Sequence, residues 1–172
     1  MIKTIEYTNG IVRMIDQTKL PLETIFVECK TIGEVSEAIK NMIIRGAPAI
    51  GVAAAMGMSL GANSIEAKSF GSFFTQFKTM GVELAKSRPT AVNLTWAIER
   101  MKRIAEQNKA FNLPNLKVRL KEEAVRIYEE DIATNQSMGQ HGQTLIKDDS
   151  VILTHCNAGA LATAGFGTAL GV

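Results

Sequence analysis

Hydrophobic and polar positions alternate at the start of the chain. The segments IKTIEYT and IVRMIDQ, residues 2–8 and 11–17, flank Asn9-Gly10, a residue pair that favours the two-residue turn of a β-hairpin. TIFVEC, residues 24–29, is a short run of β-forming residues and predicts another strand. The sequence therefore predicts a β-hairpin followed by a third strand.

Helical spacing dominates the next part of the chain. Thr31 and Glu34 have the spacing of a capping box, which predicts a helix over residues 32–44. Further helices are expected over residues 49–60, 70–86, 91–108 and 116–145. The uncharged stretch 46–65 is long enough to suggest a membrane span. Its proline, four glycines and polar residues favour a close-packed helix of a globular domain instead.

The pattern changes after the predicted turn at residues 147–149. SVILTH, residues 150–155, resembles a buried parallel strand, and a tight turn and a helix from Gly159 are expected to follow. We therefore expect an α+β domain over residues 1–146, a β-hairpin plus a helical bundle. Residues 147–172 are expected to be the first strand–helix unit of a Rossmann-like α/β domain. One strand cannot complete a parallel sheet, so we expect this second domain to be truncated and the chain to be a fragment.

Composition narrows the classes of function. The chain has 172 residues, is 46% hydrophobic and 6% aromatic, and carries a net charge of +2. This small and dispersed charge argues against nucleic acid as a partner. Two distant cysteines indicate a reducing, cytoplasmic setting, and the N-terminus lacks the apolar segment of a signal peptide. Cysteine and histidine spacing predicts no metal site.

Cys156 is the first candidate for chemistry. It follows the predicted strand 150–155 and precedes the predicted helix, where a helix N-terminus lowers a thiol pKa. The alternative is an inert, buried cysteine. The backbone N–H groups of Gly159 and Ala160 are expected to approach an anion, because only small side chains follow Cys156. The glycine spacing is not that of a dinucleotide-binding loop.

Two arginines are candidate anion ligands. Arg45 precedes Gly46 in a predicted turn between helices, and Arg88 precedes a proline at another helix junction. A guanidinium group binds phosphate through paired hydrogen bonds, so both suit a phosphorylated ligand. Trp96 is expected in the core. Glu129, Glu130 and Asp131 are expected to form a solvated helix face.

Four stretches together resemble one family. DQTKLP (16–21), IRGAPAIGVAAA (44–55), RPTAVNLTWAIERM (88–101) and ILTHCNAGALATAGFGTALGV (152–172) resemble the methylthioribose-1-phosphate isomerases. These enzymes share a superfamily with the regulatory subunits of translation initiation factor 2B. The resemblance covers the whole chain in order. Relatives of this kind are about twice as long, in agreement with the expected truncation.

The resemblance implies a cytoplasmic, homodimeric enzyme of methionine salvage that converts 5-methylthioribose 1-phosphate to 5-methylthioribulose 1-phosphate. It implies that Arg45, Gly46, Ala47 and Arg88 bind this sugar phosphate and that Cys156 is catalytic. It implies no metal or organic cofactor. The family's aspartate proton donor would follow residue 172, so we expect the 172-residue chain alone to lack isomerase activity. Ring opening followed by either a hydride shift or an enediol is compatible with the sequence.

Two other functions compete with this interpretation. A ribose-1,5-bisphosphate isomerase would need an additional basic pocket for its second phosphate. A non-catalytic regulatory subunit like those of initiation factor 2B would act through protein contacts and has no need of a thiol at position 156.

Overall fold

The computed structural model describes residues 3–172, so the first two residues of the chain, including the start of the expected first strand, lie outside the described part. Strand β1 (Ile5–Thr8) pairs antiparallel with β2 (Ile11–Ile15), and β3 (Phe26–Cys29) pairs antiparallel with the other edge of β2. Asn9 and Gly10 both have positive φ, 53° and 75°, as the type I′ turn requires. The predicted hairpin and third strand are confirmed.

All five expected helices form. They are α1 (Ile32–Lys40), α2 (Ala47–Ser64), α3 (Phe70–Ala85), α4 (Val92–Gln107) and α5 (Leu113–Gly142). The capping box of Thr31 and Glu34 is present at the start of α1. Helix α1 ends four residues before the expected position because the backbone leaves the helical region at Met42, where φ is 57°. Helix α2 is longer than expected at both ends.

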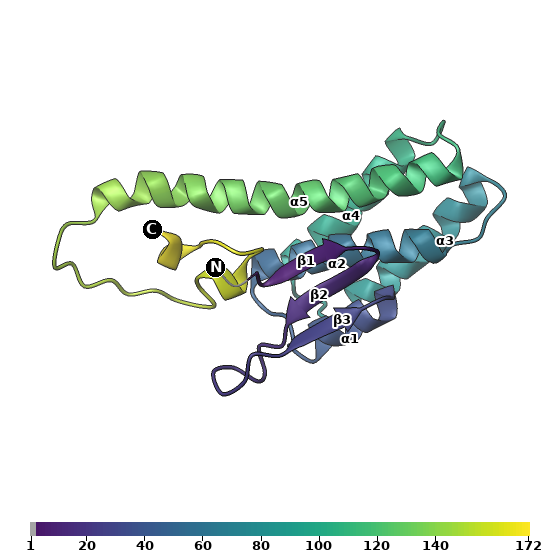
Figure 1. Ribbon diagram of the computed structural model, residues 1–172. Coiled ribbons are helices and arrows are strands. Elements are labelled where there is room, and N and C mark those ends of the chain that lie inside the picture. The colour runs from purple at the N-terminus through teal and green to yellow at the C-terminus, as the bar shows by residue number, and fades with distance from the viewer. Residues whose placement is uncertain (1–2) are drawn as a thin grey trace.

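Helix α2 is the centre of the fold. Every residue from Ala49 to Ala62 is buried, and the four other α-helices and strands β1 and β2 contact this helix (Figure 1). A Cβ atom at Gly57 would lie 3.0 Å from a methyl group of Val35 of α1, so glycine favours the close approach of these two helices. Because other elements of the fold cover α2 on all sides, this helix carries no charged residue. No helix within residues 3–172 is long and apolar enough to cross a membrane.

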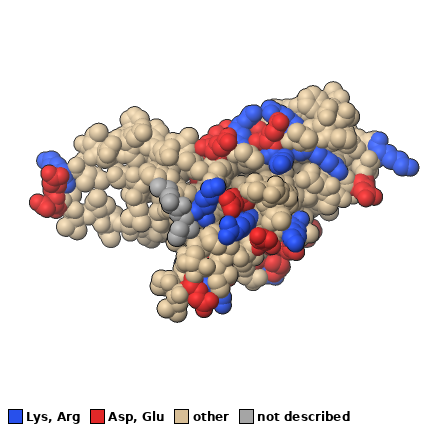
Figure 2. All heavy atoms as spheres, viewed as in Figure 1, with Lys and Arg blue, Asp and Glu red and all other residues tan. Residues whose placement is uncertain are grey.

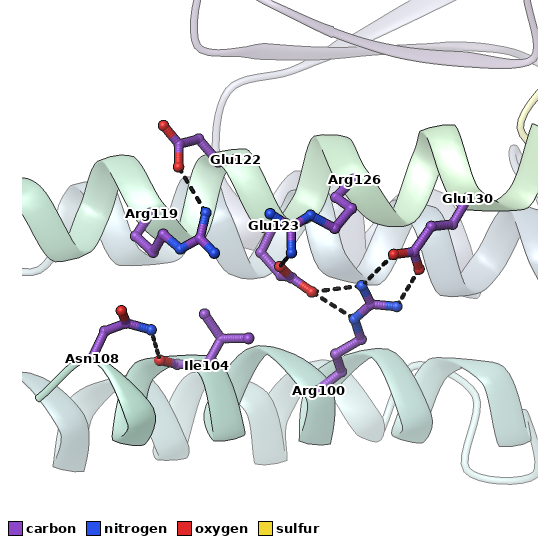
Figure 3. A network of polar contacts seen from close by, with 8 residues as sticks. All are labelled: Arg100, Ile104, Asn108, Arg119, Glu122, Glu123, Arg126 and Glu130. Atoms are coloured by element: carbon purple, nitrogen blue, oxygen red, sulfur yellow. Dashed lines mark hydrogen bonds and ion pairs between the residues drawn. The ribbon is translucent and has the colours of Figure 1, made fainter.

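A network of ion pairs joins α4 to α5 (Figure 3). The Nε atom of Arg100 donates to Oε1 of the buried Glu123 at 2.6 Å. Its two Nη atoms donate to the two carboxylate oxygens of Glu130, at 2.5 and 3.0 Å. Arg126 lies 3.4 Å from the second oxygen of Glu123. Paired, bidentate contacts of this kind fix the rotation of α5 relative to α4.

The last 30 residues differ from the expected strand–helix unit. Helix α5 continues as a single 3-10 turn at Gln143–Leu145, and the chain then returns alongside α5 as coil (Figure 1). Residues 150–155 form no strand, and only the short 3-10 turns Ala160–Ala162 and Ala169–Gly171 follow. A strand forms only where a neighbouring strand accepts its backbone hydrogen bonds, and the three-stranded sheet lies elsewhere.

Candidate functional site

The turn Arg45–Gly46–Ala47 leads into the first turn of α2. Gly46 has φ 99°, a conformation that side chains with a Cβ rarely adopt, and Pro48 lies in the first turn of the helix. No side chain caps this helix end, so its first N–H groups have no side-chain acceptor. Arg45 is exposed beside it. A positive helix end and an exposed guanidinium group together suit an anion.

Gly46 packs against the backbone of the C-terminal segment. A Cβ atom at this position would lie 2.6 Å from the carbonyl oxygen of Ala162. Ala160 belongs to the same 3-10 turn as Ala162, and Gly159 is the residue that precedes this turn. The Gly46 turn therefore packs on the end of the 3-10 turn that Gly159 and Ala160 begin. These positions begin a single 3-10 turn, however, and the α-helix expected after Gly159 does not form.

Three hydrogen bonds from distant parts of the chain hold this C-terminal segment in place. Thr4 Oγ1 donates to the carbonyl oxygen of Ala160 at 2.6 Å, and Gln17 Nε2 donates to that of Leu161 at 2.7 Å. The third bond comes from the Ala164 N–H group, which donates to Oδ2 of Asp131 on α5 at 2.7 Å. The side chains of Thr4 and Gln17 are buried. The sheet region and α5 thus position the segment from two sides.

Asp131 is a site residue that the sequence did not reveal. Its acidic neighbours Glu129 and Glu130 are exposed, but Asp131 is half-buried and bound to the C-terminal segment. Burial raises the pKa of the Asp131 carboxyl, and hydrogen bonds from Ala164 and Asn135 partly oppose that rise. The expectation of a uniformly solvated face was wrong here, because one of three consecutive helical residues points toward a covered side.

Cys156 lies in exposed coil. Its φ is 70°, and His155 and Asn157 beside it are also exposed. The burial of the segment begins only at Gly159. The expected placement of Cys156 at the end of a strand and the start of a helix is not observed, because neither element forms. The other thiol contrasts with it: Cys29 is buried in β3, and burial raises its pKa to about 11.

Arg88 is half-buried in the turn between α3 and α4. Its carbonyl oxygen accepts a hydrogen bond from the Ala91 N–H group at 3.0 Å, which shapes the approach to α4. At the start of α4, Asn93 lies against Gly51 of α2, where an added Cβ atom would be 3.1 Å from the Asn93 carbonyl oxygen. Arg88 and the Arg45 turn therefore lead into neighbouring helix ends.

A groove of about 410 Å³ lies between these helix ends and α5. Its apolar part comes from all three helices: Pro48, Val52, Val92, Trp96 and Ile127. Its polar part consists of Asn93, Glu130, Asp131 and Thr134. Pro48 directly follows the Arg45–Gly46–Ala47 turn. The groove therefore extends from the candidate anion site.

Trp96 is not in the core, as had been expected, but is 46% exposed on the wall of this groove. The helical repeat explains its position. Leu94, Ala97, Ile98 and Met101 form the buried stripe of α4, whereas Trp96 lies about 200° from Leu94 around the helix. Val92, Trp96 and Arg100 share a different stripe, and this spacing was the available signal for an exposed tryptophan.

Within residues 3–172, no group of three or more Cys, His, Asp and Glu side chains is arranged to hold a metal ion.

Comparison with known proteins identifies the family to which this chain belongs. Residues 43–172 match the initiation factor 2 subunit family, and the chain belongs to that family. Its curated relatives include methylthioribose-1-phosphate isomerases of Geobacter sulfurreducens and Geotalea daltonii, which are 54% and 55% identical to it over 170 residues. Each alignment covers 99% of this chain and 49% of the relative, so the chain spans about half the length of the curated relatives it matches.

Solved structures agree on the fold. The 5-methylthioribose 1-phosphate isomerase of Pyrococcus horikoshii matches with a TM-score of 0.90 and 43% identity, over 99% of this chain and 48% of that one. The translation initiation factor eIF-2B subunit delta of A. fulgidus matches with a TM-score of 0.85 and 38% identity, over 99% of this chain and 49% of that one. The resemblance drawn from the four sequence stretches is thereby confirmed.

Proposed function

We propose that the protein containing this chain is an aldose–ketose isomerase that converts 5-methylthioribose 1-phosphate to 5-methylthioribulose 1-phosphate in methionine salvage. One observation carries the proposal: the Gly46 turn, expected to bind substrate, packs on the segment that follows Cys156. This contact between parts of the chain more than a hundred residues apart supports a single site built from both. The many isomerases among the curated relatives support the same reaction.

Each site residue has a proposed role. Arg45 and Arg88 bind the phosphate with their guanidinium groups, and the uncapped start of α2 behind Gly46 and Ala47 adds N–H donors. The backbone N–H groups of Gly159 and Ala160, at the start of the 3-10 turn whose last residue Ala162 packs on Gly46, add further donors. The thiol of Cys156 stabilises the transition state.

The substrate constrains the reaction. Its phosphate is attached to the anomeric oxygen, so the sugar ring has to open without passing through a simple free aldehyde. The net change moves hydrogen between C1 and C2, by a hydride shift or through an enediol. We propose that the aspartate that donates the proton lies in the part of the protein beyond this chain, because the chain spans about half of its relatives.

The wider organisation is also proposed. Residues 1–146 form the N-terminal domain, and residues 147–172 begin a Rossmann-like domain whose sheet the remainder of the protein supplies. The protein acts as a cytoplasmic homodimer, without a metal or organic cofactor, and does not bind nucleic acid. Light scattering of the full-length protein tests the dimer, and a monomer at micromolar concentration would contradict it.

Turnover of 5-methylthioribose 1-phosphate by the full-length protein, followed by NMR of the sugar, tests the function. Cys156→Ser is expected to lower kcat by about 10²–10³-fold, the size of effect seen when a transition-state contact is removed. Arg45→Gln is expected to lower kcat/KM by about tenfold to a hundredfold. The matched control Arg103→Gln makes the same change at an exposed arginine of α4 that lies outside the proposed site. It is expected to leave kcat/KM unchanged.

The 172-residue chain by itself is expected to show no turnover, because the proposed proton donor lies outside it. Absence of turnover by the full-length protein would overturn the isomerase proposal. It would favour a regulatory role such as the name of the A. fulgidus neighbour suggests. Faster turnover of ribose 1,5-bisphosphate would instead identify the related bisphosphate isomerase.

A further inference from the structure

The groove between α2, α4 and α5 has a composition that packing of the bundle does not explain. Val92 is 78% exposed and Trp96 46% exposed at its wall, although large apolar side chains are normally covered. With Pro48, Val52 and Ile127 they make one apolar surface formed by three helices. An apolar pocket with a few polar groups at its rim is the usual form of a small-molecule site.

The groove begins where the substrate's phosphate is proposed to bind. Pro48 lies in the first turn of α2, directly after Ala47, and lines the groove. Asn93, on the facing end of α4, also lines it and touches Gly51 one turn further along α2. A ligand bound by its phosphate at the start of α2 can therefore extend its other end along the apolar wall.

We propose that this groove binds the 5-methylthio group of the substrate and that Trp96 and Val92 determine specificity for it. The inference rests on the proposed function. The substrate is a polar sugar with a phosphate at one end and an apolar thioether at the other. The groove offers the matching apolar surface, and a thioether sulfur makes favourable contacts with an aromatic ring.

The charge at the rim of the groove disfavours a second phosphate in the place of the methylthio group. A second phosphate at C5 would enter a groove that no lysine or arginine lines and that carries the carboxyl groups of Glu130 and Asp131. Arg100, one turn further along α4 than Trp96, already donates to the carboxylates of Glu130 and Glu123 (Figure 3). This arrangement disfavours a bisphosphate by leaving its charge unpaired.

Steady-state kinetics of the full-length protein with three substrates tests the proposal. These are 5-methylthioribose 1-phosphate, 5-deoxyribose 1-phosphate, which lacks the methylthio group, and ribose 1,5-bisphosphate. For the unmodified protein, kcat/KM is expected to be at least about tenfold higher for the methylthio sugar than for the deoxy sugar. The bisphosphate is expected to be the poorest substrate.

Trp96→Ala is expected to reduce this preference for the methylthio sugar about tenfold, and Trp96→Phe to retain part of it. Val92→Thr, which keeps shape but adds a hydroxyl group at an exposed position, is expected to reduce the preference less and guards against a folding defect in Trp96→Ala. The control Phe111→Ala removes a similarly exposed aromatic ring at the junction of α4 and α5 and is expected to leave the preference unchanged.

The outcomes separate the two proposals. If the variants lower kcat/KM for both monophosphates equally, the methylthio site is wrong and the isomerase function stands. Preference for the bisphosphate in the unmodified protein would also overturn the site. If neither monophosphate is turned over by the unmodified protein, the proposed function fails and the inference with it.

Discussion

At the scale of single residues, the two cysteines differ sharply in their surroundings. Cys156 is exposed in coil, whereas Cys29 is buried in β3 with its pKa raised to about 11 by burial and by the nearby charge of Glu34. Only a thiolate reacts rapidly with a disulfide reagent, so access and pKa both protect Cys29.

We therefore expect Ellman's reagent at pH 8 to titrate one fast thiol per 172-residue chain. Cys156→Ser is expected to remove the fast phase, and Cys29→Ala to leave it unchanged. Two fast thiols in the native chain would show that β3 opens on the time scale of the reaction.

Asp131 gives the chain a distinctive dependence of stability on pH. Burial raises its pKa in the folded state above the ordinary value of 3.8, so the folded state holds the proton more tightly than the unfolded state. The free energy of unfolding contributed by this group is therefore greatest below pH 3.8. It falls as the pH rises through the window up to the raised value, and is constant above that window.

Asp131→Asn keeps an oxygen that accepts the Ala164 N–H bond but cannot titrate. The difference in unfolding free energy between the native chain and this variant, from urea denaturation across pH, is expected to fall with rising pH through that window. Glu130 makes a contribution to the pH dependence of stability that has the opposite sign, because Arg100 lowers its pKa. This contribution is present in both proteins and therefore cancels in the difference. Asp148→Asn is the exposed control, and a flat difference for Asp131→Asn would contradict the assignment.

Residue types alone pointed to part of the site. Arg45 and Gly46 can be predicted because a glycine after a cation at a helix start is a recognisable signal, and Gly46 packs against Ala162 of the C-terminal segment. Asp131 was missed because its partner is a backbone N–H group 33 residues away, which leaves no trace in local pattern. The expectation that Trp96 lies in the core is wrong because Trp96 lies on the side of α4 away from the buried stripe of this helix.

At the scale of elements, the contact between α2 and the C-terminal segment depends on Gly46. An alanine there would need the strained φ of 99° and would press its Cβ atom on the Ala162 backbone, which cannot move aside as a side chain can. We expect Gly46→Ala to lower the free energy of unfolding by about 2–3 kcal/mol, from backbone strain and displacement of the segment.

Denaturation in urea measures this change, and Gly71→Ala is the matched control. Gly71 lies in the first turn of α3 with nothing within 4 Å of an added Cβ atom. Because alanine favours a helix over glycine, the control is expected to be neutral or to stabilise by up to about 1 kcal/mol. Equal effects of the two substitutions would mean that the Gly46 turn is not held against the segment.

Elements with their own local signals were predictable. The five helices and the hairpin each carry periodicity, a cap or a turn pair within a few residues. The segment 150–155 carries the pattern of a strand as well, but a strand is a property of a sheet rather than of a segment. Among residues 3–172 nothing pairs with it, and the same apolar residues lie in coil. The contact between Gly46 and Ala162 could not be predicted either. The residues between α5 and Gly159 form coil, and their sequence does not indicate where the chain goes after α5.

At the scale of the whole molecule, charge and apolar surface are separated. Residues 132–146 and 150–172 contain no Asp, Glu, Lys or Arg. Figure 2 shows the consequence: charged side chains cover the helical body, and the end formed by α5 and the C-terminal segment is almost bare of charge apart from its tip. On this end Val151 is fully exposed and Leu153 is 97% exposed. Exposed apolar side chains on an end that carries little charge promote association.

We therefore expect the isolated 172-residue chain to self-associate as its concentration rises, measured as apparent mass by size-exclusion chromatography with light scattering. The double variant Val151→Lys/Leu153→Lys is expected to shift the chain toward monomer, because two charges on exposed coil cost no core packing and oppose contact between apolar surfaces. The control Thr75→Lys/Gln76→Lys adds the same charge to the exposed face of α3. If both variants reduce association equally, net charge rather than the apolar end controls it. A native chain that stays monomeric at all concentrations would show that residues 150–155 are covered in solution.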